Sequence, residues 1–258
     1  MVFWSDTVLI LDLAFFALAI PATIFAGISK GGFGSGAAFA AGSILALVLD
    51  PGIALGVMLP LLMLMDVAGL KAYWRKWNWS EVRLIIYAGL PGVALGAWLY
   101  QIANADVFRL LIGGISVGFV IYQILLRGGH IPKPKQPLGT KAALFTGVTA
   151  GFTSFVSHAG GPPVAIYLLS RGLDKLAYQS GTVLIFWAIN LMKFVPYSFL
   201  GIFTWQTLLA DVLLAPFAVL GVWVGVRAHH MISERAFFGI TYVLLSLTGS
   251  KLIFDALT

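Results

Sequence analysis

The chain has 258 residues, of which 60% are hydrophobic and only 10% are charged. Soluble domains carry about 25% charged residues, so this composition indicates a protein whose main solvent is the lipid bilayer. The absence of cysteine excludes disulfides, thiolate nucleophiles and cysteine-ligated metals. The net charge of +6 comes from basic residues in short loops between apolar segments, where they act as orientation signals, so nucleic acid is not an expected partner.

Apolar segments follow one another along the chain as a set of five, a linker, and a second set of five. We predict an all-α membrane protein, a polytopic helical bundle that forms a single integral membrane domain. Its first repeat covers residues 8–126, its cytoplasmic linker residues 127–141 and its second repeat residues 142–257. The ten predicted segments, in chain order, are Val8–Ile28, Ala37–Leu49, Ile53–Tyr73, Val82–Tyr100, Phe108–Leu126, Ala142–Val156, Pro162–Ser170, Leu176–Leu200, Thr207–Val226 and Ala236–Leu257.

The second segment of each set is too short to cross the bilayer. Ala37–Leu49 has 13 residues. At 1.5 Å per residue this is about 20 Å of helix, against a hydrocarbon core of about 30 Å. Pro162–Ser170 is shorter still. We interpret both as half-helices, or tilted short helices, that follow a glycine-rich break, because irregular backbone at this depth must be buried in protein or line a wet cavity.

The two halves of the sequence resemble each other. Pro91–Trp98 matches Pro216–Trp223 at a constant offset of 125 residues, and the motif Ser29–Gly36 corresponds to Ser157–Pro163. Chance similarity between two apolar stretches is the alternative. Two inverted repeats around glycine-rich breaks are typical of secondary transporters.

Charged loops support the inverted arrangement. The loop after Tyr73 is basic, whereas the corresponding loop after Leu200 is uncharged, and the bias is reversed at the next pair of loops. Basic loops stay cytoplasmic. The pattern therefore predicts halves of opposite topology with both termini periplasmic.

The glycine-rich breaks are the predicted substrate site. A helix that begins after such a break exposes unpaired N–H groups and the positive end of its dipole, which together bind anions. The alternative is close helix packing through small residues. The candidate binding residues of the two motifs are Ser29, Lys30, Gly31, Gly32, Gly34, Ser35, Gly36, Ser157, His158, Gly160 and Gly161.

Each motif also carries an ionisable residue at the corresponding position, Lys30 in the first and His158 in the second. A cation at membrane depth costs about 2.5–3.5 kcal/mol on insertion scales and is a functional candidate for that reason. Lys30 could pair with an anion, or its ammonium could extend to the cytoplasmic interface. His158 could bind the anion, carry a proton, or simply pack in the core.

Further polar residues lie on the long apolar segments. Asp66 is interpreted as the only carboxylate inside such a segment, and its counterpart in the second repeat is Asn190. Asp66 could relay protons, pair with Lys30 or make a structural contact. Lys193 is expected nearer the outer surface, at an entrance. Ser180 and Thr182 offer hydroxyl donors to a substrate or to neighbouring helices.

Signals for catalysis are weak. The sequence contains no HExxH, GxSxG or Walker A pattern, so we expect neither an enzyme nor an ATP-driven pump. His229 and His230 lie beside Glu234, but a histidine pair in a loop is usually solvated. We expect no metal and no cofactor.

The order of these motifs resembles the TauE/SafE family of membrane permeases. The resemblance depends on Gly31–Gly36 after the first helix, Asp50-Pro51 at the next long helix, Gly160-Gly161 after the sixth segment, and Ser180-Gly181-Thr182. It extends from about Leu13 to Leu257. It implies a bacterial inner-membrane protein that moves sulfite, thiosulfate, sulfoacetate or other small sulfur-containing or organic anions. The histidine and prolines of the second motif depart from the family's more purely glycine-rich form.

Together these features lead to the hypothesis of an exporter of a small sulfur-containing anion such as sulfite, thiosulfate or an organosulfonate. It would work by alternating access, through rocking of its two halves. Its expected partners are the anion, the lipid bilayer and protons. An importer or an anion channel for the same substrates is an alternative, and a membrane-embedded enzyme is a weaker one. The oligomeric state does not follow from the sequence.

Overall fold

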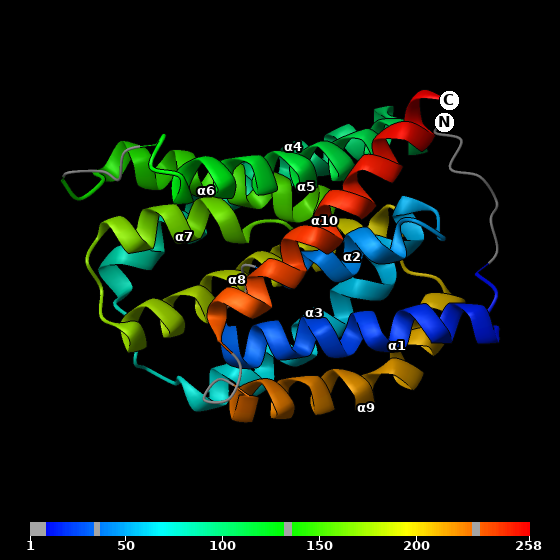
Figure 1. Ribbon diagram of the computed structural model, residues 1–258, viewed down its shortest axis with the longest axis horizontal. Coiled ribbons are helices and arrows are strands. Elements are labelled where there is room, and N and C mark those ends of the chain that lie inside the picture. Colours follow the sequence, from blue (N-terminus) through cyan, green and yellow to red (C-terminus); the bar gives the residue numbers. More distant parts are fainter. Residues whose placement is uncertain (1–8, 34–36, 132–135, 229–232) are drawn as a thin grey trace.

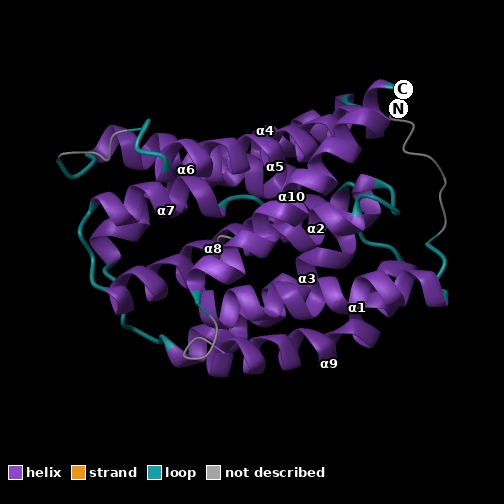
Figure 2. Cartoon of the chain, viewed as in Figure 1, coloured by secondary structure: helices purple, strands orange, loops and turns teal. Residues whose placement is uncertain are grey.

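The computed structural model describes residues 9–33, 37–131, 136–228 and 233–258, and this part of the chain is helical throughout, with no strand (Figure 1, Figure 2). Each of the ten predicted segments corresponds to one α-helix. The elements, in chain order, are α1 (Leu13–Ile28), the π-helical turn η1 (Ser29–Phe33), α2 (Phe39–Leu45), α3 (Pro51–Ala72), α4 (Trp79–Ile102), α5 (Ala105–Arg127), α6 (Thr140–Ser157), α7 (Gly161–Ser170), α8 (Lys175–Phe199), α9 (Trp205–Ala228) and α10 (Glu234–Leu257).

Seven spans in the described ranges are long and apolar enough to cross a bilayer: α1 with η1, α3, α4, α5, α8, α9 and α10. The second helix of each set is short, as predicted, with 7 residues in α2 and 10 in α7. The prediction of a polytopic, all-helical membrane protein is therefore confirmed.

Local chemistry sets several helix boundaries. The Asp50 carboxylate accepts a hydrogen bond from the Gly52 N–H at 2.9 Å and caps α3. Asn104 and Asp174 cap α5 and α8 in the same way. The first turn of α7 contains prolines, which suit a position where no N–H donor is needed.

The tightest packing joins one half of the chain to the other through glycines. A Cβ atom placed on Gly92 of α4 would lie 2.1 Å from the Val148 carbonyl oxygen of α6. On α1, a Cβ at Gly27 would lie 2.8 Å from the Ala218 carbonyl oxygen of α9. Small residues allow such close approach, which is how helices associate where lipid removes the hydrophobic driving force.

The same close approaches give the relative directions of the helices. Gly89 and Gly96 of α4 meet Gly147 and Phe155 of α6 in ascending order, so the two helices run parallel. Helices α1 and α9 are also parallel. Helices α5 and α10 are antiparallel. Gly113 contacts Ile253, whereas Val117, one turn later on α5, contacts Gly249, which lies one turn earlier on α10.

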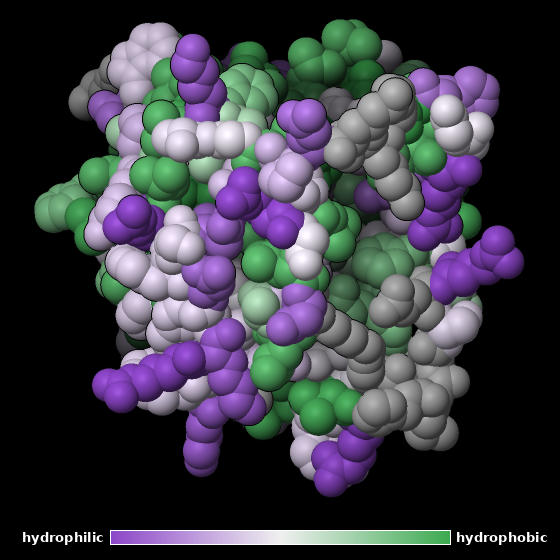
Figure 3. Space-filling model, turned by 90° about the vertical axis from the view of Figure 1, so that its left-hand side faces the viewer, coloured by the Kyte–Doolittle hydropathy of each residue, from purple (hydrophilic) through white to green (hydrophobic). Residues whose placement is uncertain are grey.

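Charge divides the two ends of the bundle. The end of α3, the start of α4, the end of α5 and the start of α6 share one end, at the left in Figure 1. Figure 3, which faces this end, shows many hydrophilic side chains among hydrophobic ones. The end of α10 and the loop between α2 and α3 lie at the opposite end. The basic residues of the first end that belong to the described ranges include Lys71, Arg75, Lys76, Arg83, Arg127, Lys141, Arg171, Arg227 and Arg235.

A bidentate ion pair fixes α7 at the basic end. The Arg171 guanidinium donates to both carboxylate oxygens of Glu81 on α4, at 2.6 and 2.9 Å. Its third nitrogen donates to the Leu138 carbonyl at 3.1 Å. The pair connects the C-terminal end of α7 to α4 and to the segment that precedes α6.

Substitution of one packing glycine tests this arrangement. We expect Gly92→Ala to push α4 away from α6, at a cost of about 1–3 kcal/mol, the usual cost of overpacking. Gly118→Ala is the matched control, because a Cβ there meets nothing within 4 Å. Thermal unfolding in detergent should show a lower melting temperature for Gly92→Ala and no decrease for Gly118→Ala. Equal melting temperatures would contradict the packing described.

Candidate functional site

A buried ion pair lies at the centre of the bundle. The Lys30 ammonium of η1 pairs with the Asp66 carboxylate of α3, and both side chains are buried. The other Asp66 oxygen accepts a hydrogen bond from the Asn190 side-chain amide of α8 at 2.6 Å. The structure thus joins three residues that the sequence singled out. Lys30 does not extend to the interface.

A second buried cation lies beside this cluster. Lys193 of α8 is fully buried, with a relative exposure of 0%, and its ammonium contacts Nδ1 of His158 at 2.9 Å. It also donates to the Ser154 carbonyl at 3.0 Å. Lys193 is therefore enclosed within the bundle instead of exposed at an entrance, and along α8 it lies nearer than Asn190 to the end opposite the basic loops. Asn190 and Lys193 are three positions apart on α8 and therefore lie on the same face of the helix. Because this face packs into the core, both side chains are buried.

A small cavity connects the two clusters. It has a volume of ≈ 10 Å³, which is about the space that one water molecule needs. Its polar lining brings together residues from both glycine motifs and from the long helices. The residues that line it are Lys30, Ala38, Leu62, Ser154, His158, Phe186 and Asn190.

The first glycine motif serves helix packing in its described part. Gly31 and Gly32 extend α1 as the π-helical turn η1, and a Cβ on either would lie 2.4 or 2.3 Å from a carbonyl oxygen of α9. This is the packing alternative that the sequence left open. The predicted binding residues Gly34, Ser35 and Gly36 lie outside the described residues.

The second motif forms a true break between α6 and α7. His158 ends α6 in the left-handed conformation, with φ 57°, and α7 begins at Gly161 after the cap residue Gly160. Two of the first three residues of α7 are prolines, which have no N–H. The N-terminus of α7 therefore offers the positive end of its dipole but few free N–H donors. An anion site at a helix N-terminus, as the sequence predicted here, would use more of these donors.

The remaining predicted hydroxyls bond to their own helices. Ser157 donates to the Thr153 carbonyl at 3.0 Å, Ser180 to Ala177 at 3.2 Å and Thr182 to Gln179 at 2.8 Å. Ser29 is buried. None of these four residues lines the small cavity.

One buried carboxylate was missed. Asp66 is not the only carboxylate in a long apolar segment, because Asp211 lies in α9 with a relative exposure of 6%. Its Oδ1 atom is buried without a hydrogen bond to any described residue. No group of three or more metal-ligating side chains occurs in the described ranges, and His229 and His230 fall outside them.

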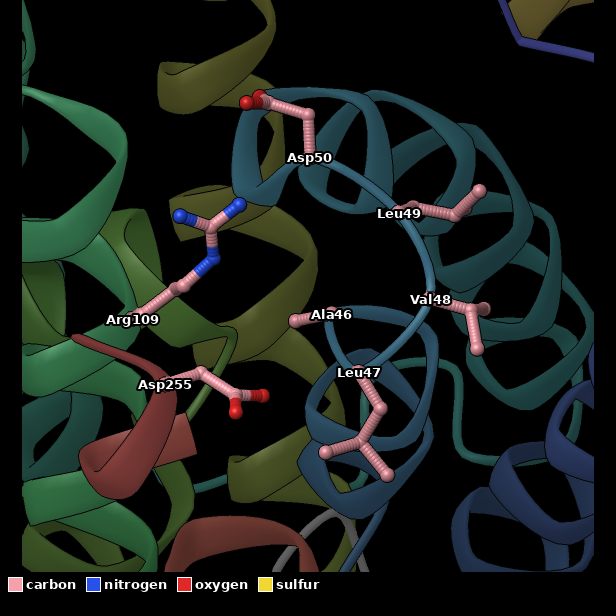
Figure 4. Close-up of a pocket in the computed structure, with 7 residues that line it drawn as sticks. All are labelled: Ala46, Leu47, Val48, Leu49, Asp50, Arg109 and Asp255. Carbon is pink, nitrogen blue, oxygen red and sulfur yellow. The ribbon is translucent and has the colours of Figure 1, made fainter. Parts of the chain in front are cut away.

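A larger pocket opens at the end of the molecule opposite the basic loops. It has a volume of ≈ 320 Å³ and is lined by Asp50, Arg109, Asp255 and the segment from Ala46 to Leu49. Figure 4 shows the Arg109 guanidinium turned toward Asp50, with Asp255 on the other side. Arg109 also pairs with Asp106 at 2.6 Å, and Asp255 with Lys251. Charges of both signs therefore alternate around this mouth.

Separating the central ion pair should be costly. Removing one partner of a buried pair leaves an uncompensated charge, at a cost of about 3–5 kcal/mol. We expect Lys30→Met and Asp66→Asn each to lower the melting temperature in detergent. The double variant should be more stable than either single variant, because no unpaired charge remains from the pair. Additive losses would show that the two side chains do not interact.

The Asp50 cap gives a pH-dependent prediction. Burial raises the pKa of Asp50 above 3.8, while the Gly52 N–H and the Arg109 guanidinium oppose the rise. The folded state therefore holds the proton more tightly than the unfolded state. The free energy of unfolding falls as pH rises from about 3.8 through the raised pKa, and is level above it.

Asp50→Asn keeps a capping side chain and removes the ionisation. Its melting temperature relative to the unmodified chain should rise across this pH window and then stay constant. In an Arg109→Gln background, the difference in melting temperature between the Asp50 and Asp50→Asn proteins should be larger. The reason is that this substitution removes an attraction between the guanidinium and the ionised carboxylate. A difference that is independent of pH would show that the Asp50 carboxyl titrates alike in both states.

Comparison with known proteins adds one match. A family model described as "Sulfite exporter TauE/SafE" matches residues 19–252. No curated protein and no solved structure matches the chain. The family is one of membrane transporters and not of enzymes, in agreement with the multi-pass helical fold. Since the match covers almost the whole chain, the protein belongs to the TauE/SafE sulfite exporter family.

Proposed function

We propose that the protein is a secondary transporter that exports a small sulfur-containing anion such as sulfite, thiosulfate or an organosulfonate. The observation that carries this proposal is the buried cluster of Lys30, Lys193 and His158 around a single carboxylate, Asp66. Buried cations in a membrane protein mark a pathway for ions or substrates. Two lysines against one carboxylate favour an anion.

Within this site the proposed roles differ. Lys30, His158 and Asn190 line the cavity and would contact the anion through N–H donors. Asp66 would hold Lys30 and Asn190 in position instead of touching the anion. Gly160 and Gly161 would let the backbone turn beside the site, while Ser29, Ser157, Ser180 and Thr182 would support the surrounding helices.

An inverted repeat is part of the proposal. In such a repeat α1 corresponds to α6, and α4 corresponds to α9. The contact between α1 and α9 then corresponds to the contact between α6 and α4, and the helices of both pairs run parallel. The repeat also maps α5 onto α10 and α3 onto α8, and both of these pairs are antiparallel. Opposite directions in corresponding helices support an inverted relation between the halves.

The packing changes the expected moving parts. The halves of the chain interlock, because α1 packs against α9 and α4 against α6. Alternating access would therefore move one body built around α1 and α9 against another built around α4 and α6. Asp66 on α3 and Asn190 on α8 lie where the two bodies meet. The cavity of ≈ 10 Å³ is smaller than a sulfite ion, so binding requires such a movement.

The proposed orientation follows from charge. The end that carries the basic loops would face the cytoplasm of a bacterial cell. The C-terminal end of α10 and the pocket of Asp50, Arg109 and Asp255 would then face the periplasm. We place this pocket at the outer end of the export path.

Transport by purified protein in proteoliposomes tests the function. We expect saturable movement of labelled sulfite, thiosulfate or a sulfonate, with acceleration by unlabelled substrate on the opposite side. Lys30→Ala and His158→Ala should each slow transport by about tenfold or more, the loss expected when a hydrogen bond of about 1.5–3 kcal/mol to a charged group is removed.

Lys141→Ala, at the exposed start of α6, is the matched control and should transport normally. Normal transport by both site variants would remove this site assignment. A linear, unsaturable flux without acceleration by unlabelled substrate would identify a channel for the same anions, and no flux of any tested anion would overturn the proposed function.

A further inference from the structure

Lys193 is a fully buried cation for which the described fold supplies no full counter-charge. Its ammonium forms no salt bridge with a described carboxylate, and the only carboxylate of the cluster, Asp66, is already paired with Lys30. The partial negative end of α6, represented by the Ser154 carbonyl, compensates only part of a unit charge. An ammonium removed from water in this way costs several kcal/mol.

The contact with His158 offers a way to avoid this cost. A hydrogen bond between the lysine Nζ and the imidazole Nδ1, 2.9 Å apart, needs one proton between the two atoms and tolerates no second one. With Lys193 charged, Nδ1 accepts and the histidine proton resides on Nε2. That atom is buried and makes no hydrogen bond of normal geometry to a described residue, although the Leu55 backbone of α3 lies close enough to interact with the imidazole, and the His158 side chain lines the cavity. With Lys193 neutral, the whole cluster carries no net charge.

We propose that the Lys193–His158 pair takes up one proton together with the substrate anion and releases it when the anion leaves. This inference rests on the proposed anion site between Lys30 and His158. With the anion bound, Lys193 is an ammonium that compensates it through His158, whose Nε2–H donates to the anion. Without the anion, the proton leaves Lys193, and within this cluster only Lys30 and Asp66 remain charged.

The surroundings of Lys193 contain few other ionisable groups. Lys30 from η1 and Asp66 from α3 face it at longer range, with opposite effects on its charge. Tyr197, one turn along α8, places its ring centroid 5.9 Å from the ammonium. From α6 only His158, at its end, is ionisable in this region, and the described parts of α4 and α7 present no charged group to it. Binding or release of the anion should therefore change mainly the protonation of the Lys193–His158 pair.

One proton per anion has different electrical consequences for different substrates. A sulfonate monoanion would cross as a neutral complex with its proton. Thiosulfate, a dianion, would cross with one net negative charge. Sulfonate flux should therefore follow a pH gradient and ignore membrane potential, whereas thiosulfate flux should respond to both.

The experiment uses the full chain in proteoliposomes with a pH-sensitive dye inside. Methanesulfonate and thiosulfate are the probes, and a potassium gradient with valinomycin sets the membrane potential. Proton and anion fluxes should be equal for both probes. Transport without proton movement in the unmodified chain overturns this inference and leaves the proposed function intact. Absence of flux for these two probes and for sulfite overturns both.

Lys193→Arg separates proton release from binding. A guanidinium stays charged at all accessible pH values, so it can compensate the anion but cannot release the proton. We expect exchange of labelled for unlabelled methanesulfonate to persist, because exchange needs no release of the proton. Net flux driven by the pH gradient should fall by about tenfold or more, the factor that corresponds to a shift of one pKa unit. Retained net flux with proton movement in this variant would overturn the role of Lys193.

Lys193→Met is the second variant, in case the larger guanidinium prevents folding. It leaves the cluster of Lys30, Asp66 and His158 without net charge when no anion is present. We expect a normal melting temperature in detergent, weaker anion protection against thermal unfolding and loss of proton movement. Lys141→Met, an exposed lysine of α6, is the matched control and should behave as the unmodified chain. Equal anion protection in Lys193→Met and Lys141→Met would overturn the inference.

Discussion

The buried contact of Lys30 with Asp66 is the interaction on which the rest of the site depends. It brings η1, at the end of the first helix, against α3, and the second Asp66 oxygen brings α8 to the same point through Asn190. A charged pair in a membrane core is stable only if each member stays paired. The three elements therefore keep their relative depth, and the cavity forms between them and the break that follows α6.

Glycine makes this central arrangement possible. Lipid gives helices no hydrophobic reason to associate, so their contacts depend on close packing and polar bonds. Gly27 and Gly31 let α1 lie directly on α9, and Gly92 and Gly151 do the same for α4 and α6. These two pairs each combine helices from both halves of the chain. The resulting bodies differ from the two halves that the order of segments suggests, which is why we propose their relative movement as the transport step.

The buried cluster contains one more lysine than carboxylates, and this excess of potential positive charge is the basis of the proposed anion site. Lys30 is neutralised by Asp66, whereas Lys193 contacts only neutral acceptors, His158 and the Ser154 carbonyl. In the function that we propose, an anion entering the cavity would meet the imidazole of His158 as a donor and the ammonium of Lys193 directly behind it. The proposed coupling of anion binding to a proton follows from the same geometry, because an anion would compensate the buried charge on Lys193.

The sequence by itself was sufficient to predict the ten helices, the two short ones and the membrane setting, because hydrophobic runs and glycine or proline breaks are local signals. It also indicated Lys30, His158, Asp66 and Asn190 as candidates, since polar residues in apolar segments are conspicuous. The TauE/SafE resemblance followed from the order of those motifs, and the family match agrees with it.

Only the tertiary structure decided which of these residues meet. Asp66 and Asn190 are 124 positions apart, and the hydrogen bond between them depends on where α3 crosses α8. The position of Lys193 near the end of an apolar run gave no sign that its ammonium turns toward the break after α6. Gly31 and Gly32 read as a substrate loop, yet α9 packs on them. Contacts of this kind depend on how helices cross in three dimensions, which local sequence patterns do not contain.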